Sequence, residues 1–402
     1  MPHSTELPAR ADITGSRLPS LTGLRFIAAL MVFLFHGVLY AGLFASPGAT
    51  ETLGAVVGGG GWTGVSFFFI LSGFVLTWSV RSADTVRKFY RRRLFKIFPN
   101  HLVTAVIAFV LLIAVTGAAA KGTWWYNLLL IQAWFPDLSV LYSGNVVSWS
   151  LSCELLFYLA FPALYFGIKR IRPERLWAWT GVVVLAIFLV PSLATVLPEA
   201  QALAGGTMMP TGLTLFEQWF VASFPPVRML EFVFGIFIAR IVITGRTIPL
   251  SFGGAVALAV AAYALTPLFS GPYRVAATMV VPLGLIIVAG AKVDAAKEGS
   301  WLSSRFMVWL GDISFAFYMV HQLVLDYGHR LLGQTNTWST PVALAVLALL
   351  FAGALLAATV LYTCVERPIM RRFASSRRAP RLASVPAASI SADPPSGDRL
   401  AS

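Results

Sequence analysis

Charged side chains are scarce in this sequence. Asp, Glu, Lys and Arg make up only 12% of the 402 residues, whereas 57% are hydrophobic and the mean hydropathy is +0.77. Soluble domains carry about 25% charged residues. The composition therefore excludes an ordinary soluble protein and predicts a polytopic membrane protein.

Cysteine is scarcer still. The chain has only Cys153 and Cys364, and both fall in apolar segments. This excludes a framework of disulfides, and there is no CxxC pair to hold a metal. Because no basic neighbour in the sequence would favour its thiolate, we expect Cys153 to be a small packing residue rather than a nucleophile. No metal is expected.

Long apolar runs, in contrast, are abundant. Ten of them approach the length needed to cross a bilayer. They lie near 22–42, 61–80, 100–118, 148–168, 176–197, 228–244, 249–268, 275–291, 306–326 and 340–364. The aromatic stretch 124–135 is too short to span and predicts an interfacial or re-entrant piece.

The two ends of the chain are polar. Residues 1–20 contain no short apolar run with a cleavage site, so they predict a cytoplasmic N-terminal tail rather than a secretory signal. Residues 369–402 are rich in Ser, Ala and Pro and predict a disordered cytoplasmic tail. A single transmembrane domain is expected over 21–368.

Acidic residues are few, 17 against 30 Lys and Arg, which gives a formal net charge of +13. Such a balance suits either nucleic acid or the cytoplasmic loops of a membrane protein. With the N-terminus inside, only Lys121, Arg228, Arg274 and Arg330 fall at or near the outer side. The distribution favours membrane lipids over nucleic acid as the partner. It predicts an all-α fold of about ten transmembrane helices with both termini cytoplasmic.

The first apolar segment, LTGLRFIAALMVFLFHG, carries two ionisable groups. Arg25 and His36 lie eleven positions apart, about three helical turns, so they share one face at about 16 Å separation. Ionisable groups in hydrocarbon usually face a protein interior or a wet cavity. Alternatively, Arg25 extends to water at the helix end and His36 is bonded to a neighbouring helix.

Other polar residues fall at a depth similar to that of His36. They are Ser150, Glu154, Arg228, Glu231, Ser314, Tyr318 and His321. Five of them have a structural alternative: Ser150 and Glu154 as links between helices, Arg228 and Glu231 as a self-neutralising pair, and His321 as a core histidine. Together, two histidines and a carboxylate at one depth predict a buried polar site.

The strongest run of charge is RKFYRRRLFKIFP, residues 87–99, which we expect to form a cytoplasmic loop. It is typical of a positive-inside anchor with interfacial aromatics. It also suits a clamp for a polyanionic cytosolic ligand, because arginine binds phosphate in a bidentate manner. Glu366, just beyond the last apolar segment, is expected to pair with a basic loop.

Six segments in order resemble the acyltransferase-3 family of integral membrane O-acyltransferases. They are LTGLRFIAALMVFLFHG (21–37), GVSFFFILSGFVL (64–76), YRRRLFKIFP (90–99), WSLSCELLFYLAFP (149–162), GDISFAFYMVHQ (311–322) and VERP (365–368). One departure is Lys96, which stands where the family often has arginine. The resemblance implies an acyl-CoA donor and a hydroxyl acceptor on a sugar or glycosylated molecule.

Combining the resemblance with the residue chemistry assigns expected roles. Arg91, Arg92, Arg93 and Lys96 would hold the CoA phosphates, and Arg25 would guide the thioester. His36 would be the general base, Glu154 would orient it or the acceptor, and His321 would assist proton transfer. The expected substrate-binding residues are Ser150, Tyr318, Arg228 and Glu231.

The nature of the acceptor stays open at this point. An envelope polysaccharide or glycolipid and a macrolide-type natural product both fit, and the outer-half depth of the polar residues favours the former. The expected location is the bacterial plasma membrane. The alternative function is a transporter that uses intramembrane His, Glu and Arg as a proton relay, although no internal repeat typical of transporters is evident.

Overall fold

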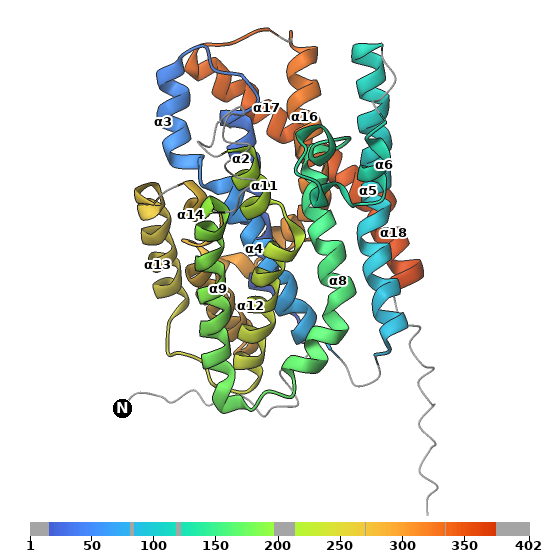
Figure 1. The fold of residues 1–402 in the computed structure, drawn as a ribbon. Coiled ribbons are helices and arrows are strands. Elements are labelled where there is room, and N and C mark those ends of the chain that lie inside the picture. Colours follow the sequence, from blue (N-terminus) through green and yellow to red (C-terminus); the bar gives the residue numbers. More distant parts are fainter. Residues whose placement is uncertain are drawn as a thin grey trace, which may run out of the picture.

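The computed structural model describes residues 16–80, 84–117, 122–196, 214–269, 271–333 and 335–374. Within these ranges the regular elements are helices, and the one β-type contact is an isolated bridge between Phe44 and Trp338. The predicted all-α class is confirmed. Figure 1 shows the helices running mostly along one direction, as expected for a membrane bundle.

The longer helices, in chain order, are α2 (Pro19–Leu39), α3 (Pro47–Val57), α4 (Gly60–Trp78), α5 (Val86–Thr116), α8 (Trp149–Ile168), α9 (Leu176–Val196), α11 (Leu215–Ala222), α12 (Pro225–Ile243), α13 (Phe252–Leu265), α15 (Val280–Ala295), α16 (Arg305–Leu331) and α17 (Thr340–Leu361). The short helices are α6 (Trp124–Leu128), α7 (Leu138–Leu141), α14 (Gly271–Ala276) and α18 (Arg367–Ile369). Two π-helical turns, η6 (Tyr362–Glu366) and η7 (Met370–Ala374), flank α18.

All ten predicted apolar segments coincide with helices. In the described part of the chain, eight helical stretches are long and apolar enough to cross a membrane. The other two segments are α12, which carries Arg228, Glu231 and Arg240, and the shorter apolar helix Phe252–Leu268. The chain is therefore a multi-pass membrane protein, and the count of ten spans stays a prediction.

The expectation of a loop over 87–99 is wrong. These residues form the first turns of α5, which begins after the N-cap Thr85, whose hydroxyl accepts a hydrogen bond from the amide of Lys88, and continues through Pro99. Arg, Lys and Leu are good helix formers, and neighbouring helices make an internal proline tolerable in a membrane helix. The stretch 124–135, in contrast, forms only α6 and a short 3₁₀ turn (Gln132–Trp134), too short to span.

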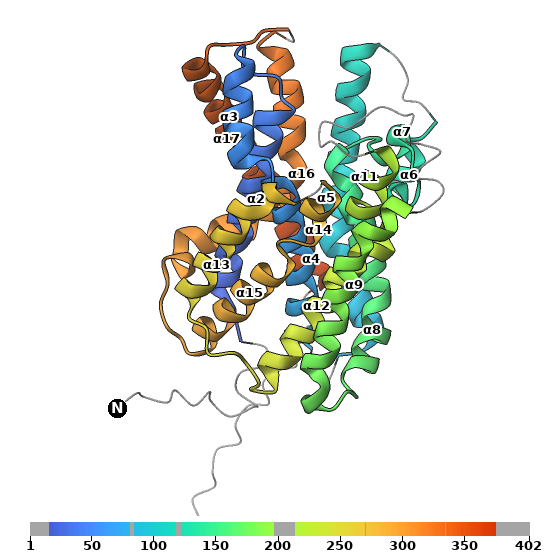
Figure 2. The same ribbon diagram turned by 60° about the vertical axis from the view of Figure 1, so that its left-hand side comes forward.

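The helices at the centre approach one another through glycine. A Cβ on Gly235 of α12 would lie 2.0 Å from the carbonyl oxygen of Ile70 in α4, and one on Gly73 would lie 2.0 Å from the carbonyl oxygen of Phe232. Small residues allow such backbone contact between membrane helices. Helix α2 packs against α4 and α8 packs against α12, while α16 packs on α2 and α5 lies beside α8 and α16 (Figure 2).

The two ends of the described chain lie on one side of the bundle. The Trp78 indole at the end of α4 donates to the carbonyl oxygen of Ser16, and the rings of Phe373 and Phe95 stack at 4.8 Å near the start of α5. We call this end of the bundle, which carries the basic part of α5, the basic side, and the opposite end the far side. Helical structure continues to Ala374, past the predicted boundary at 368, whereas 1–15 and 375–402 lie outside the described residues.

Candidate active site

A cavity of about 80 Å³ lies between α2, α4, α5, α8 and α16, and we call it the central cavity. Its polar lining residues come from four of these helices: Arg25, Lys96, Ser150, Glu154, Tyr158 and Tyr318. Ser150, Glu154 and Tyr158 follow one another at intervals of four along α8, so the helix presents all three to the cavity. Arg25, predicted near the basic end, thus lies in the same cavity as the predicted Glu154.

Hydrogen bonds fix the far-side half of the cavity wall. The hydroxyls of Ser150 and Tyr318 lie 2.9 Å apart, joining α8 to α16, and the Tyr318 hydroxyl also lies 3.1 Å from the carbonyl oxygen of Val147. Glu154 accepts a hydrogen bond of 3.1 Å from the Tyr158 hydroxyl on its own helix. The hydrogen-bond partner of Glu154 is therefore Tyr158 rather than either of the predicted histidines.

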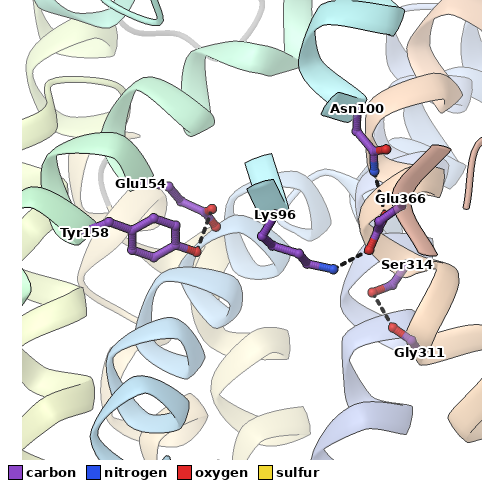
Figure 3. A network of polar contacts seen from close by, with 7 residues as sticks. All are labelled: Lys96, Asn100, Glu154, Tyr158, Gly311, Ser314 and Glu366. Carbon is purple, nitrogen blue, oxygen red and sulfur yellow. Dashed lines mark hydrogen bonds and ion pairs between the residues drawn. The ribbon is translucent and has the colours of Figure 1, made fainter. Parts of the chain in front are cut away.

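Lys96 stands at the basic-side end of the central cavity. Figure 3 shows its side chain extending away from Glu154 towards Glu366, with which it forms an ion pair. The second oxygen of Glu366 accepts a hydrogen bond of 2.6 Å from the Asn100 amide. Since the Glu366 side chain is only 3% exposed, Lys96 neutralises a buried carboxylate and Asn100 satisfies its second oxygen. Glu366 was predicted to pair with a basic loop; it does pair with a basic residue, but Lys96 belongs to helix α5 rather than to a loop.

A second, more open cavity of about 510 Å³ adjoins Lys96 on the basic side, and we call it the basic funnel. Its lining residues are Arg25, Lys96, Asp312, Tyr362, Glu366, Arg367, Met370 and Arg371. The funnel shares Arg25 and Lys96 with the central cavity, so these two cations stand where the cavities meet. The sequence interpretation missed Arg367 and Arg371; the motif VERP was the signal, but residues beyond 368 were predicted to be disordered.

The other basic residues of α5 are placed differently. Arg91 is exposed, and Arg92 pairs with Asp84 at 2.8 Å. The Arg93 guanidinium lies 5.7 Å from the ring centre of Tyr158, behind the central cavity. Of the four predicted phosphate-binding residues, Lys96 is thus the one that lines both cavities.

His36 and His321 lie side by side at the end of the site nearest the far side. Nδ1 of His36 is 3.0 Å from Nε2 of His321, and Nδ1 of His321 is 2.7 Å from the carbonyl oxygen of Tyr318. A carbonyl only accepts, so Nδ1 of His321 carries a proton and its Nε2 accepts in the neutral form. Nδ1 of His36 must then donate, which leaves Nε2 of His36 with the free lone pair.

The two predicted residues on α12 form a buried ion pair. Arg228 and Glu231 are both 1% exposed and lie 2.9 Å apart, and Arg228 also donates to the Ser66 hydroxyl. The guanidinium carbon of Arg228 lies 5.1 Å from the ring centre of Phe69, which lines the central cavity. The pair therefore supports the cavity wall from behind. Its self-neutralising geometry is confirmed, and both side chains are buried in the protein interior.

Neither cysteine takes part in this site. The buried Cys153 thiol donates to the carbonyl oxygen of Ser223 at 3.3 Å, and Cys364 is exposed. Among the residues that the structure describes, there is no group of three or more His, Cys, Asp or Glu side chains arranged to hold a metal ion.

Comparisons with known proteins place the chain in a family. Residues 18–362 match the family model of the acyltransferase-3 type, described as an acyltransferase domain. The chain is 40% identical to acyltransferase MdmB of Streptomyces mycarofaciens over 88% of its own length and 92% of that protein. It is 25% identical to the exopolysaccharide production protein ExoZ of Rhizobium meliloti, over 78% of its own length and 90% of that protein.

A third relative matches a smaller part of this chain. The O-acetyltransferase OatA of Staphylococcus aureus is 26% identical over 40% of this chain and 26% of that protein. No solved structure matches this chain significantly. The family match covers all the helices that build the central cavity and the histidine pair. The chain belongs to the acyltransferase-3 family of integral membrane O-acyltransferases.

Proposed function

We propose that this protein transfers an acyl group from acyl-CoA, taken from the cytoplasmic side of the bacterial plasma membrane, to a hydroxyl of a carbohydrate or glycosylated small molecule. The observation that carries the proposal is that the basic funnel and the central cavity are neighbours that share Arg25 and Lys96 as lining residues. Acyl-CoA has a polyanionic nucleotide end, which suits the basic funnel, and an acyl-bearing arm of lower polarity, which suits the central cavity beyond it.

The basic funnel suits the nucleotide end of the donor. Arg367 and Arg371 add two guanidinium groups to Arg25 and Lys96, and guanidinium forks match phosphate oxygens. The positive-inside rule assigns this side to the cytoplasm, together with both termini. The thioester arm would extend past Arg25 into the central cavity, where Ser150 and Tyr318 would contact the thioester or the acceptor.

His36 suits the general base. Its Nε2 takes the proton of the acceptor hydroxyl while the hydroxyl oxygen attacks the thioester carbonyl. As the tetrahedral intermediate collapses, the carbon–sulfur bond breaks and the CoA sulfur takes the proton from the imidazolium. His321 accepts from Nδ1 of His36 throughout, which fixes the tautomer and favours the charged form.

Glu154, Arg228 and Glu231 then act through their neighbours. Glu154 accepts a hydrogen bond from Tyr158 and places a carboxylate in the central cavity. Arg228 packs against the ring of Phe69, and Glu231 pairs with Arg228. The transporter alternative has weaker support, because the relatives are named an acyltransferase and an O-acetyltransferase.

The test is acyl-CoA turnover by membranes that contain this protein. Acetyl-, propionyl- and isovaleryl-CoA would each be offered with envelope glycans or a macrolide, and free CoA and acylated product would be measured. We expect acceptor-dependent product that His36→Ala abolishes at equal expression. The matched control is His329→Ala, a partly exposed histidine further along α16 that bonds to the carbonyl oxygen of Asn336. Product undiminished by His36→Ala would contradict the assigned base.

A further inference from the structure

A third and larger cavity, of about 680 Å³, opens on the far side of the bundle, and we call it the far-side cavity. It lies between the end of α2, helix α3, the start of α4, and the segment from α13 to α14. Figure 1 places α3 at the end of the bundle opposite to that from which the described chain begins. Its volume lies within the range of roughly 300–1,000 Å³ that small-molecule sites occupy.

Residues that line the far-side cavity contact the histidine pair. Tyr40 and Phe35 line the cavity, and their rings lie 5.9 and 5.1 Å from the imidazole of His36. From the opposite direction, Tyr318 lines the central cavity and its ring lies 5.6 Å from that of His321. The histidine pair therefore lies between residues that line the far-side cavity and a residue that lines the central cavity.

The lining of the far-side cavity is aromatic with a few polar groups. Phe35, Tyr40, Trp62 and Tyr263 supply ring faces and edges, and the Tyr263 hydroxyl is anchored to the carbonyl oxygen of Val56. The polar lining residues are Thr50, Glu51, Thr266 and Arg274. Rings with electron-rich faces suit the C–H faces of a sugar, and a few hydroxyl, carboxylate and guanidinium groups suit its hydroxyls.

We propose that the far-side cavity binds the acceptor, and that the acceptor is an amphipathic glycoside: a sugar carried on an apolar ring or chain. This inference rests on the proposed function. A fully hydrophilic polysaccharide would leave most of its hydroxyls without partners against these apolar walls, which opposes binding. The apolar body occupies the aromatic part of the cavity, and the sugar extends past Phe35 and Tyr40 to Nε2 of His36, where its hydroxyl oxygen meets the thioester carbonyl that arrives from the central cavity.

Helix α3 offers a matched pair of variants for the test. Ala55 lines the far-side cavity, whereas its neighbour Val56 is 67% exposed and does not. Because α3 has no buried residue, a tryptophan at either position leaves the core intact. Ala55→Trp fills the cavity, and Val56→Trp controls for the added ring.

The experiment measures binding rather than turnover. The full chain in lipid nanodiscs would be titrated with tritiated erythromycin as the glycoside probe, with maltoheptaose as the hydrophilic competitor, while acetyl-CoA binding is measured separately. We expect saturable glycoside binding in the wild type and in Val56→Trp, a loss of at least tenfold in affinity in Ala55→Trp, and no competition by maltoheptaose. Acetyl-CoA affinity should be equal in all three proteins.

Several results would overturn the inference. Equal glycoside affinity in Ala55→Trp and the wild type would place the acceptor elsewhere. Competition by maltoheptaose would identify a hydrophilic glycan instead, and absence of saturable binding would mean that lipid occupies the cavity. Failure of the proposed function is distinguishable from all of these, because it would appear as absence of acetyl-CoA binding.

Discussion

The imidazoles of His36 and His321 are joined by a contact of 3.0 Å between Nδ1 of His36 and Nε2 of His321, although 285 positions separate them in the chain. His321 is completely buried and is bonded to the backbone of its own helix, while His36 is partly exposed. The buried histidine is therefore placed to act on the other histidine, as a positioning residue, rather than on the substrate.

This arrangement predicts that two substitutions of His321, by leucine and by glutamine, lower kcat to different extents. His321→Leu should lower kcat about 100-fold, because Nδ1 of His36 loses its acceptor and the tautomer is no longer fixed, within the 10²–10⁴-fold range of general-base catalysis. His321→Gln offers an amide oxygen near the position of Nε2 and should recover about tenfold. The measurement is kcat and KM for acyl-CoA, with KM unchanged.

The control for these two variants is His329→Leu, which removes a partly exposed imidazole of the same helix and should leave kcat unchanged. If His321→Gln were as inactive as His321→Leu, an acceptor for Nδ1 of His36 would not be the function of His321. A rise in KM for acyl-CoA would instead indicate contact with the donor.

A second prediction concerns the ion pair of Lys96 with Glu366. Lys96→Met leaves a buried carboxylate with only Asn100 as partner and should destabilise the protein by about 3 kcal/mol. Adding Glu366→Gln removes the charge and should restore most of the stability. Thermal unfolding of the purified single and double variants measures both steps.

The same double variant distinguishes a structural role of Lys96 from a role in binding acyl-CoA. It should remain folded yet bind acyl-CoA weakly, because Lys96 is also one of the two cations between the basic funnel and the central cavity. Normal acyl-CoA affinity in the stable double variant would restrict Lys96 to a structural role.

A third prediction concerns Arg367 and Arg371. Each Arg→Ala substitution should raise the KM for acetyl-CoA by roughly tenfold, since a hydrogen bond to a charged group contributes about 1.5–3 kcal/mol. The KM for S-acetylpantetheine, which lacks the nucleotide phosphates, should not change. Arg175→Ala, which removes an exposed arginine between α8 and α9, is the matched control. Equal losses with both donors would contradict phosphate recognition by the funnel.

A fourth prediction tests the glycine contact between α4 and α12. Gly235→Ala places a methyl group 2.0 Å from the Ile70 carbonyl oxygen, so the helices must separate and the thermal midpoint should fall clearly. Gly181→Ala in α9 meets no atom within 4 Å and should be neutral or stabilising by up to about 1 kcal/mol, because alanine favours helix. Similar midpoints for the two variants would contradict close packing at Gly235.

Much of the architecture was predictable from local properties. Segment length and hydropathy located all ten helical segments, because the bilayer imposes an apolar length on each helix independently of its neighbours. The loop expected over 87–99 was wrong because charge marked the segment as exposed. Charge does not distinguish an exposed loop from an exposed helix, and the Thr85 cap and the helix formers favour the helix.

The sequence by itself therefore determined a helical membrane protein, its family, and the residue types of the site, including Arg25, His36, Glu154 and His321. Only the tertiary structure decided which of them meet. In the structure His36 contacts His321, and Glu154 bonds to Tyr158. Arg228 packs against Phe69 outside the central cavity, and Arg367 and Arg371 line the basic funnel. The physical reason is that depth along a helix follows from residue number, whereas the neighbour across the bundle depends on helix rotation and close packing, which no single segment encodes.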